Sequence, residues 1–180
     1  MGNFNKLADF DFRKIKLVLT DIDGVWTDGG LFYSSEGMVM KRFNVKDGMG
    51  VNRLRDRGIE TGIVSGDRSD IITARGLRLK LDLIYIGIAD KKQALDEICQ
   101  KRNLCYENIA FIGDDVNDIT MIENVGLSAA PADAVPEIIE MVDYKCQKKG
   151  GDACFREFIE MIIRNIDKQI VSENQGVQSL

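Results

Sequence analysis

Short apolar stretches alternate with amphipathic stretches along most of the chain. Runs rich in β-branched residues predict buried strands, and apolar residues at helical spacing predict helices between them. The outermost stretches lack this pattern, so residues 1–12 are expected to form a loose leader and residues 169–180 a flexible tail. The predicted strands are residues 15–20, 59–64, 83–86, 109–112 and 127–129, and the predicted helices are residues 70–80, 90–102 and 116–124.

Three further elements complete this pattern. Apolar residues on both sides of the sequence Ser-Ser-Glu-Gly predict a β-hairpin over residues 31–43. Asp47 is expected to cap a helix that ends before Gly58. The last element is expected to be an amphipathic helix, with an apolar face formed by Phe155, Phe158, Ile159, Ile162 and Ile166.

Alternating strands and helices predict an α/β fold, in which a parallel sheet is covered by helices on both faces. At 180 residues the chain is expected to form one domain, residues 13–168. Ligands of such sheets bind in the crevice at the carboxyl ends of the strands. The residues directly after each predicted strand are therefore the candidates for chemistry.

Composition narrows the function classes. The chain holds 24 Lys and Arg residues against 29 Asp and Glu residues, and it contains no histidine. This excludes Ser-His-Asp and Cys-His triads and histidine zinc sites, so acid–base chemistry must come from carboxylates, lysine, cysteine or tyrosine. The acidic balance, with a net charge of −5, argues against a nucleic-acid partner.

The amino-terminal residues and the cysteines favour a cytoplasmic location. The first residues show no positively charged segment followed by an apolar core, so no signal peptide is apparent. The apolar runs are far shorter than the ~20 residues of a membrane span, and no membrane partner is expected. The four cysteines form no Cys-x-x-Cys pair, which favours reduced thiols over a zinc or redox site.

Polar residues follow four of the predicted strands. Crowded carboxylates repel one another, and a hard divalent cation such as Mg²⁺ relieves that repulsion. A lysine and a Ser-Gly turn at the same edge provide charge and donors for a phosphate. In chain order these residues are Asp21 and Asp23, then Ser65 and Gly66, then Lys91, then Asp114, Asp115 and Asp118.

Each of these pieces has a structural interpretation when it is taken alone. Carboxylates after a strand cap helices, Ser-Gly is a common turn, and lysines at a helix start are often solvated. Their joint occurrence at successive strand ends favours a functional site. A response-regulator receiver also gathers carboxylates and a lysine around Mg²⁺, but its acidic pair comes first and its lysine last. The order seen here resembles the haloacid dehalogenase superfamily of aspartyl-phosphate enzymes.

Five segments extend this resemblance to the capless 3-deoxy-D-manno-octulosonate 8-phosphate phosphatase family. The resemblance implies a Rossmann-like sheet in which the hairpin at residues 31–43 replaces a cap domain. It also implies a homotetramer assembled around these hairpins. The segments are DIDGVWTDGGLFYSSEG (21–37), RFNVKDGMG (42–50), SGD (65–67), IGDDVND (112–118) and GGDACFREF (150–158).

The resemblance also implies a role for each residue at the strand ends. Asp21 would be the nucleophile, and Asp23 would be the general acid and then the general base. Asp21, the backbone carbonyl of Asp23 and Asp114 would hold Mg²⁺. The supporting carboxylates would be Asp115 and Asp118, and the phosphoryl group would be bound by Ser65, Gly66 and Lys91.

The expected function is hydrolysis of the octulosonate 8-phosphate, a step in lipopolysaccharide precursor synthesis. Related families act on nine-carbon sugar acid 9-phosphates, or serve as non-catalytic tetramerisation modules, and both remain alternatives. In the family, a neighbour's carboxyl-terminal segment helps to close the site, and Gly150, Gly151 and Arg156 match that segment. Arg156 and Arg75 are the candidates for contacts with the sugar acid.

Three residues depart from the family pattern. Asp67 follows Ser-Gly where many relatives have arginine, and Ala153 replaces a glycine of the carboxyl-terminal segment. Trp26 stands where leucine is common among the octulosonate enzymes. All three are expected to affect the substrate end of the pocket, and they leave the phosphoryl chemistry unchanged.

Overall fold

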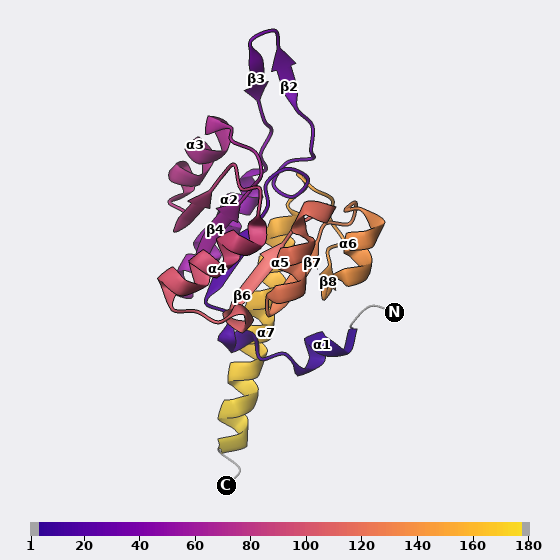
Figure 1. Ribbon diagram of the computed structural model, residues 1–180. Coiled ribbons are helices and arrows are strands. Elements are labelled where there is room, and N and C mark those ends of the chain that lie inside the picture. Colours follow the sequence, from indigo (N-terminus) through magenta and orange to yellow (C-terminus); the bar gives the residue numbers. More distant parts are fainter. Residues whose placement is uncertain (1–3, 178–180) are drawn as a thin grey trace.

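Six parallel strands form the central sheet of the computed structural model, which describes residues 4–177 (Figure 1). The strand order is β5-β4-β1-β6-β7-β8, and every pairing in this sheet is parallel. This confirms the expected α/β fold. The strands are β1 (Leu17–Thr20), β4 (Glu60–Val64), β5 (Leu83–Tyr85), β6 (Ile109–Ile112), β7 (Leu127–Ala130) and β8 (Tyr144–Lys145).

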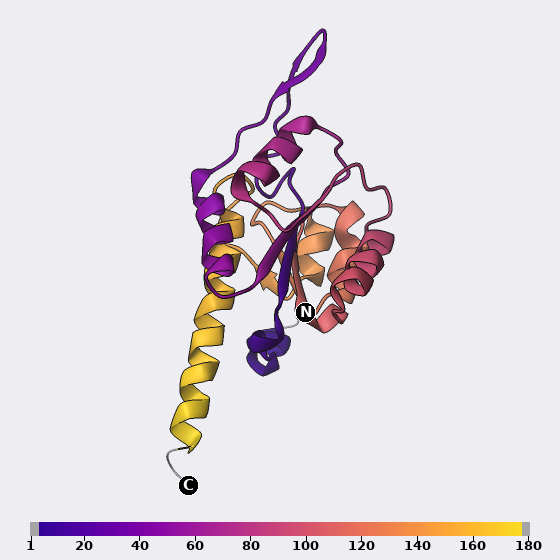
Figure 2. The same cartoon turned by 90° about the vertical axis from the view of Figure 1, so that its left-hand side faces the viewer.

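Helices cover both faces of the sheet (Figure 2). One face is covered by α2 (Val45–Arg55), α3 (Asp70–Leu79) and α7 (Cys154–Val177). The other face is covered by α4 (Lys91–Arg102), α5 (Ile119–Asn124) and α6 (Pro136–Met141). The remaining helical elements are α1 (Phe4–Asp9) and the 3₁₀ turns η1 (Phe12–Lys14), η2 (Tyr106–Asn108) and η3 (Val116–Asp118).

Side chains of the central strand alternate between the two apolar layers. Val18 packs toward α2 and α7, whereas Leu17 and Leu19 pack toward α4 and α5. All three are fully buried, as expected for a parallel strand covered on both faces. Burial of these side chains fixes the register of β1 in the sheet.

The chain reverses its direction of travel across the sheet at β1. From β1 it proceeds to β4 and β5 on one side, and then crosses over to β6, β7 and β8 on the other. The switch point therefore lies between β1 and β6, where Thr20 is in register with Ile112. In sheets of this kind, ligands bind beyond the carboxyl ends of the strands at such a switch point.

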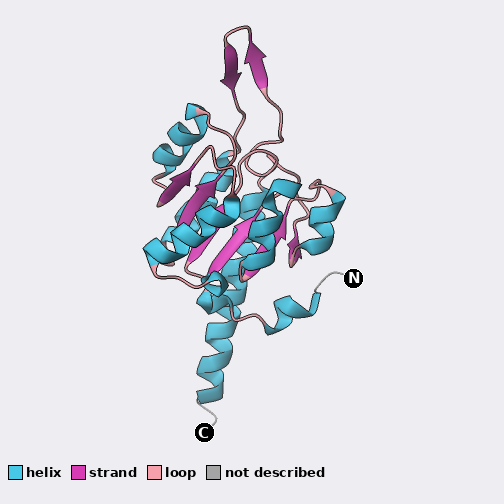
Figure 3. Ribbon diagram, in the orientation of Figure 1, coloured by secondary structure: helices cyan, strands magenta, loops and turns pink. Residues whose placement is uncertain are grey.

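The hairpin forms a separate two-stranded sheet, β2 (Phe32–Ser34) and β3 (Gly37–Met40). It projects from the carboxyl edge of the main sheet, while α7 extends beyond the opposite edge (Figures 1 and 3). Its side chains are solvent-exposed in the single chain. The large apolar residues involved are Leu31, Phe32, Tyr33, Val39 and Met40. None of the helices within residues 4–177 is long and apolar enough to cross a membrane.

Parts of the expected leader and of the expected tail form helices or contact each other. Phe12 is buried against α7, and the side chain of Gln169 contacts Phe10 and Phe12, accepting from Phe12 N and donating to the carbonyl of Phe10. The residues expected to be a loose leader are therefore tied to α7 from Phe10 onward. That helix continues to Val177, through much of the expected tail, and residues 1–3 and 178–180 lie outside the described residues.

Asp47 is not the cap of its helix. Asn44 caps α2, accepting from Lys46 N, because the helix begins three residues earlier than expected. Asp47 instead points inward without exposed surface, and its Oδ1 accepts a hydrogen bond from Arg156 N at 3.0 Å. Its Oδ2 is buried and has no hydrogen-bond partner among residues 4–177. Burial, opposed by the charges of Arg75 and Lys148, raises the pKa of Asp47 to about 6.

We expect Asp47→Asn to stabilise the protein at pH 7.5. A pKa raised from 3.8 means that ionised Asp47 opposes folding, so its stability contribution falls as pH rises to about 6 and is constant above it. The free energy of unfolding of Asp47→Asn should exceed that of wild type by roughly 1–3 kcal/mol at pH 7.5, and by less at pH 4.5. Urea unfolding at both pH values measures this, with exposed Asp56→Asn as the control. Destabilisation at pH 7.5 would contradict the argument.

Candidate functional site

The end of β1 places Asp21 at the switch point. The residue is nearly fully buried, and its Oδ1 accepts a hydrogen bond from the backbone N–H of Ile22 at 2.7 Å. Its Oδ2 lies 3.0 Å from Nζ of Lys91. The carboxylate is thus held in place from both oxygens.

Lys91 is the first residue of α4, directly after the N-cap Asp90. Its buried ammonium bridges two carboxylates, with Nζ 3.0 Å from Asp21 Oδ2 and 2.5 Å from Asp118 Oδ1. Burial alone would lower the pKa of Lys91, but the negative charges of Asp21 and Asp118 raise it above its usual value. Lys91 therefore carries a fixed positive charge at the switch point.

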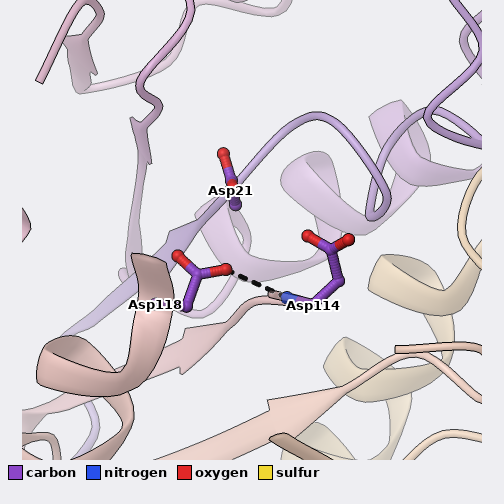
Figure 4. A group of neighbouring side chains, drawn as sticks. All are labelled: Asp21, Asp114 and Asp118. Carbon is purple, nitrogen blue, oxygen red and sulfur yellow. Dashed lines mark hydrogen bonds between the residues drawn. The ribbon is translucent and has the colours of Figure 1, made fainter. Parts of the chain in front are cut away.

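The loop after β6 contributes the other two carboxylates of the cluster. Asp118 Oδ2 accepts a hydrogen bond from Asp114 N at 2.9 Å, which fixes the turn between them (Figure 4). One carboxylate oxygen from each of Asp21, Asp114 and Asp118 lies within 4.8 Å of the other two. Carboxylates from two adjacent strands therefore converge on one point.

The electrostatics of this cluster fit a divalent cation. Burial, and then the charges of Asp21 and Asp118, raise the pKa of Asp114 to about 8. Burial and the charge of Asp21 also raise the pKa of Asp118. Three carboxylates and the ammonium of Lys91 give a formal charge of −3 + 1 = −2, which one Mg²⁺ balances.

A glycine lets the β1 loop approach the cluster closely. Gly24 has φ +79°, and a Cβ built there would lie 1.9 Å from Asp114 Oδ2. No other residue fits without displacing that carboxylate. The Asp-x-Asp-Gly sequence thus combines the acidic groups with the one residue type that admits Asp114 beside them.

Asp23 faces a second lysine. Both of its carboxylate oxygens contact Nζ of Lys41, at 2.5 and 2.6 Å, and its Oδ1 also accepts from the hydroxyl of Thr27 at 3.1 Å. The same ammonium lies 2.7 Å from Asp67 Oδ2. Burial would lower the pKa of Lys41, but its hydrogen bonds to Asp23 and Asp67 raise it. Sequence reasoning missed Lys41, because no local pattern links a residue after the hairpin with carboxylates 18 and 26 positions away.

Ser65 and Gly66 lie where the sequence placed them, directly after β4. Ser65 is nearly fully buried, and its hydroxyl accepts a hydrogen bond from Asp67 N at 3.3 Å. Gly66 is exposed at the tip of this turn. The turn presents a hydroxyl at the same edge of the sheet as Asp21.

Three of the predicted residues have structural partners outside the cluster. Asp115 is exposed and caps η3, accepting from Val116 N at 2.7 Å. The guanidinium of Arg75 stacks 5.5 Å from the ring centre of Phe43, at the base of the hairpin. Arg156 pairs with Glu160 on its own helix at 2.6 Å. Within residues 4–177 of one chain, neither arginine contacts the carboxylate cluster, so their predicted substrate roles stay predictions.

Two of the three unusual residues belong to the core. Trp26 has no exposed surface and packs against Phe155, with ring centres 4.9 Å apart. Ala153 is also fully buried, in a left-handed backbone conformation with φ +66°. Neither side chain has free surface in the single chain, and the expectation that both affect the substrate end of the pocket stays a prediction. Asp67, in contrast, is partly exposed and pairs with Lys41 at the carboxyl edge of the sheet.

The carboxyl-terminal Gly-Gly segment packs behind the β1 loop. A Cβ at Gly150 would lie 2.1 Å from the backbone oxygen of Gly24, and Gly151 N donates to the carbonyl of Val25 at 2.9 Å. This contact supports the loop that carries Asp21 and Asp23.

Known proteins are similar to this chain in both sequence and fold. The sequence model of the haloacid dehalogenase-like hydrolases matches residues 68–157. The 3-deoxy-D-manno-octulosonate 8-phosphate phosphatase of Haemophilus influenzae is 36% identical over 159 residues, which are 88% of each chain. The corresponding enzyme of Escherichia coli K12 is 34% identical over 165 residues, covering 92% of this chain and 88% of the relative.

Solved structures of such phosphatases superpose on this chain. The enzyme from Yersinia pestis matches with a TM-score of 0.85 and 33% identity, over 92% of this chain and 86% of its own. The enzyme from Moraxella catarrhalis, solved with a magnesium ion, a phosphate ion and KDO, matches with a TM-score of 0.83 and 30% identity, over 94% and 96%. Together with the acidic cluster at the switch point, these similarities show that the chain belongs to the 3-deoxy-D-manno-octulosonate 8-phosphate phosphatase family of the haloacid dehalogenase-like hydrolases.

Proposed function

We propose that this protein is a Mg²⁺-dependent phosphatase that hydrolyses 3-deoxy-D-manno-octulosonate 8-phosphate to the free sugar acid and inorganic phosphate. One observation carries the proposal: Asp21 lies at the switch point, 3.0 Å from buried Lys91 and in one cluster with Asp114 and Asp118. Relatives with this fold bear that enzyme's name, and one was solved with magnesium, phosphate and KDO.

Asp21 serves as the nucleophile in this proposal. Its carboxylate oxygen bonds to phosphorus while the bond from phosphorus to the sugar oxygen breaks, which gives an aspartyl-phosphate. Lys91 and Ser65 bind the transferred phosphoryl group, aided by the Gly66 turn, and Lys91 offsets its negative charge. Asp21, the carbonyl of Asp23 and Asp114 would hold Mg²⁺, with Asp115 and Asp118 in support, and the bound cation supplies charge neutralisation.

Asp23 serves as the acid–base group. It gives a proton to the departing sugar oxygen and then takes one from the water that attacks the aspartyl-phosphate. Its carboxylate is held by Thr27 and Lys41, and about a third of its side-chain surface is exposed. That partial exposure lets a leaving group and a water molecule reach it.

A non-catalytic assembly role is less well supported. Such a module has no need of the buried contact between Lys91 and Asp21, since burying charged groups costs stability unless they are paired. A nine-carbon sugar acid 9-phosphate remains the competing substrate. Asp67 is the departure from the family pattern that is partly exposed at the carboxyl edge of the sheet.

We expect Asp21→Asn to abolish phosphate release. The amide keeps the shape of the carboxylate but is not a nucleophile, so kcat should fall about 1000-fold or more. Phosphate release in Mg²⁺ buffer measures the loss, and circular dichroism checks the fold. Exposed Asp56→Asn should retain wild-type activity. Substantial turnover by well-folded Asp21→Asn would show that another residue is the nucleophile.

The substrate is tested by comparing the eight-carbon 8-phosphate with the nine-carbon 9-phosphate. We expect kcat/KM to be higher for the eight-carbon substrate by about 10-fold or more, because one misplaced polar contact in a pocket costs at least that much. Phosphate release from both, measured with the same enzyme preparation, decides between them. A reversed preference would assign the protein to the nine-carbon acids.

The proposed homotetramer uses the hairpin as its contact surface. Tyr33 is 66% exposed and Val39 58% exposed, a large apolar surface for an element surrounded by solvent. Arg156 of the partner subunit would then help to bind the substrate carboxylate, with Arg75 as the other candidate. The free thiols of all four cysteines agree with the proposed cytoplasmic location.

We expect the double variant Tyr33→Asp and Val39→Asp to reduce the molecular mass of the assembly. Two carboxylates in an apolar interface are costly to bury, so the tetramer should dissociate to dimers or monomers. Light scattering after size-exclusion chromatography measures the mass. Val171→Asp, an exposed apolar position at the far end of α7, is the control. An unchanged mass would exclude the hairpin as the contact.

A further inference from the structure

Lys41 occupies an unusual position for a lysine. It follows β3 directly, at the base of the hairpin, and its side chain has no exposed surface. Its ammonium contacts three oxygens, the two of Asp23 at 2.5 and 2.6 Å and Oδ2 of Asp67 at 2.7 Å. An ammonium has three donors, and these three contacts use all of them.

This arrangement joins three separate segments of the chain. Asp23 lies in the loop after β1, Asp67 lies in the loop after β4, and Lys41 lies at the foot of the hairpin. Asp67 is itself fixed, because its Oδ1 accepts from Ser69 N at 2.8 Å. Lys41 is therefore anchored on one side by a rigid turn and holds Asp23 on the other.

The contact restrains Asp23 in particular. Because Lys41 contacts both oxygens of Asp23, rotation of that carboxylate would break at least one hydrogen bond. The Thr27 hydroxyl adds a third restraint, on Oδ1. General acid catalysis requires a donor oxygen within hydrogen-bond reach of the leaving oxygen, so a restrained carboxylate is an advantage.

We propose that Lys41 is a positioning residue for Asp23, and that Asp67 serves as its second anchor. This inference rests on the proposed function, in which Asp23 protonates the leaving group. Asp67 thereby gains a role in phosphoryl transfer.

Substrates with different leaving groups distinguish a loss of Asp23 positioning from a general disruption of the site. When Asp21 bonds to phosphorus, the electron pair of the breaking bond passes to the leaving oxygen, and a sugar alkoxide needs the proton of Asp23. p-Nitrophenolate is a stable anion and departs without that proton. Loss of the restraint on Asp23 should therefore slow the first step for alkyl phosphates and leave it unchanged for p-nitrophenyl phosphate.

The test is Lys41→Met, which keeps a similar length and removes the donors. The single-turnover rate constant for the sugar acid phosphate should fall about 30- to 100-fold, while KM should change by less than about 3-fold. The first-turnover burst of p-nitrophenolate should keep its rate within about 3-fold. Arg42→Met, the exposed neighbour that pairs with Asp28, is the matched control and should change neither. An equal fall with both substrates, or no fall with either, would overturn the proposal.

A second variant covers the case in which Lys41→Met does not fold. Asp67→Asn removes one anchor and keeps Lys41 and its contact with Asp23. It should show the same dependence on the leaving group with a smaller loss, about 3- to 10-fold for the sugar substrate. Wild-type activity of Asp67→Asn on the sugar phosphate would refute the anchoring role of Asp67.

Phenyl phosphate separates failure of this inference from failure of the proposed function. Its leaving group is far more basic than p-nitrophenolate, and it carries no sugar to be recognised. Wild type that hydrolyses both aryl phosphates but no sugar acid phosphate would refute the proposed substrate. Lys41→Met should still slow the hydrolysis of phenyl phosphate more than that of p-nitrophenyl phosphate. An equal effect of the substitution on the two aryl phosphates would refute the positioning role.

Discussion

Two buried ammonium groups hold together the carboxylates at the carboxyl edge of the sheet. Lys91 joins Asp21 to Asp118, and Lys41 joins Asp23 to Asp67. Without these cations, the loops after β1, β4 and β6 would bring like charges together in a partly dehydrated space. The positions of Asp21, Asp23 and the acidic cluster all depend on this charge balance.

The packing of the fold brings these charged groups close together before they pair. Full burial of β1 between two helical layers fixes the strand, and the switch point separates the loops on either side. The small size of Gly24 then admits Asp114 beside the β1 loop. Charge pairing therefore acts on groups that packing has already brought within a few ångströms.

Sequence reasoning located the part of the site that is encoded locally. Asp21, Ser65, Lys91 and Asp114 each follow a strand, and apolar runs reveal where strands end. The Lys41 contacts depend on where the chain re-enters the domain after the hairpin, beside the loops that carry Asp23 and Asp67, which no local pattern encodes. In the same way, the spacing of apolar residues does not distinguish the partly buried cap Asn44 from the fully buried Asp47 three positions later.

The remaining differences in the fold have related causes. Helix α6 and strand β8 are too short to give a clear periodicity, and both were absent from the expected elements. The order of residues 10–12 depends on Gln169, which lies more than 150 positions away. The full burial of Trp26 and Ala153 likewise depends on α7, which packs against the β1 loop from the far end of the chain.

The backbones of Gly150 and Gly24 are in direct contact, and this contact couples the two ends of the domain mechanically. With no room for even a methyl group between these backbones, a shift of Gly150 toward Gly24 cannot be absorbed by side-chain rearrangement. It must move the loop that carries Asp21 and Asp23. A partner or neighbouring subunit that binds the segment before α7 would therefore act directly on the positions of Asp21 and Asp23, without a relay of intermediate contacts.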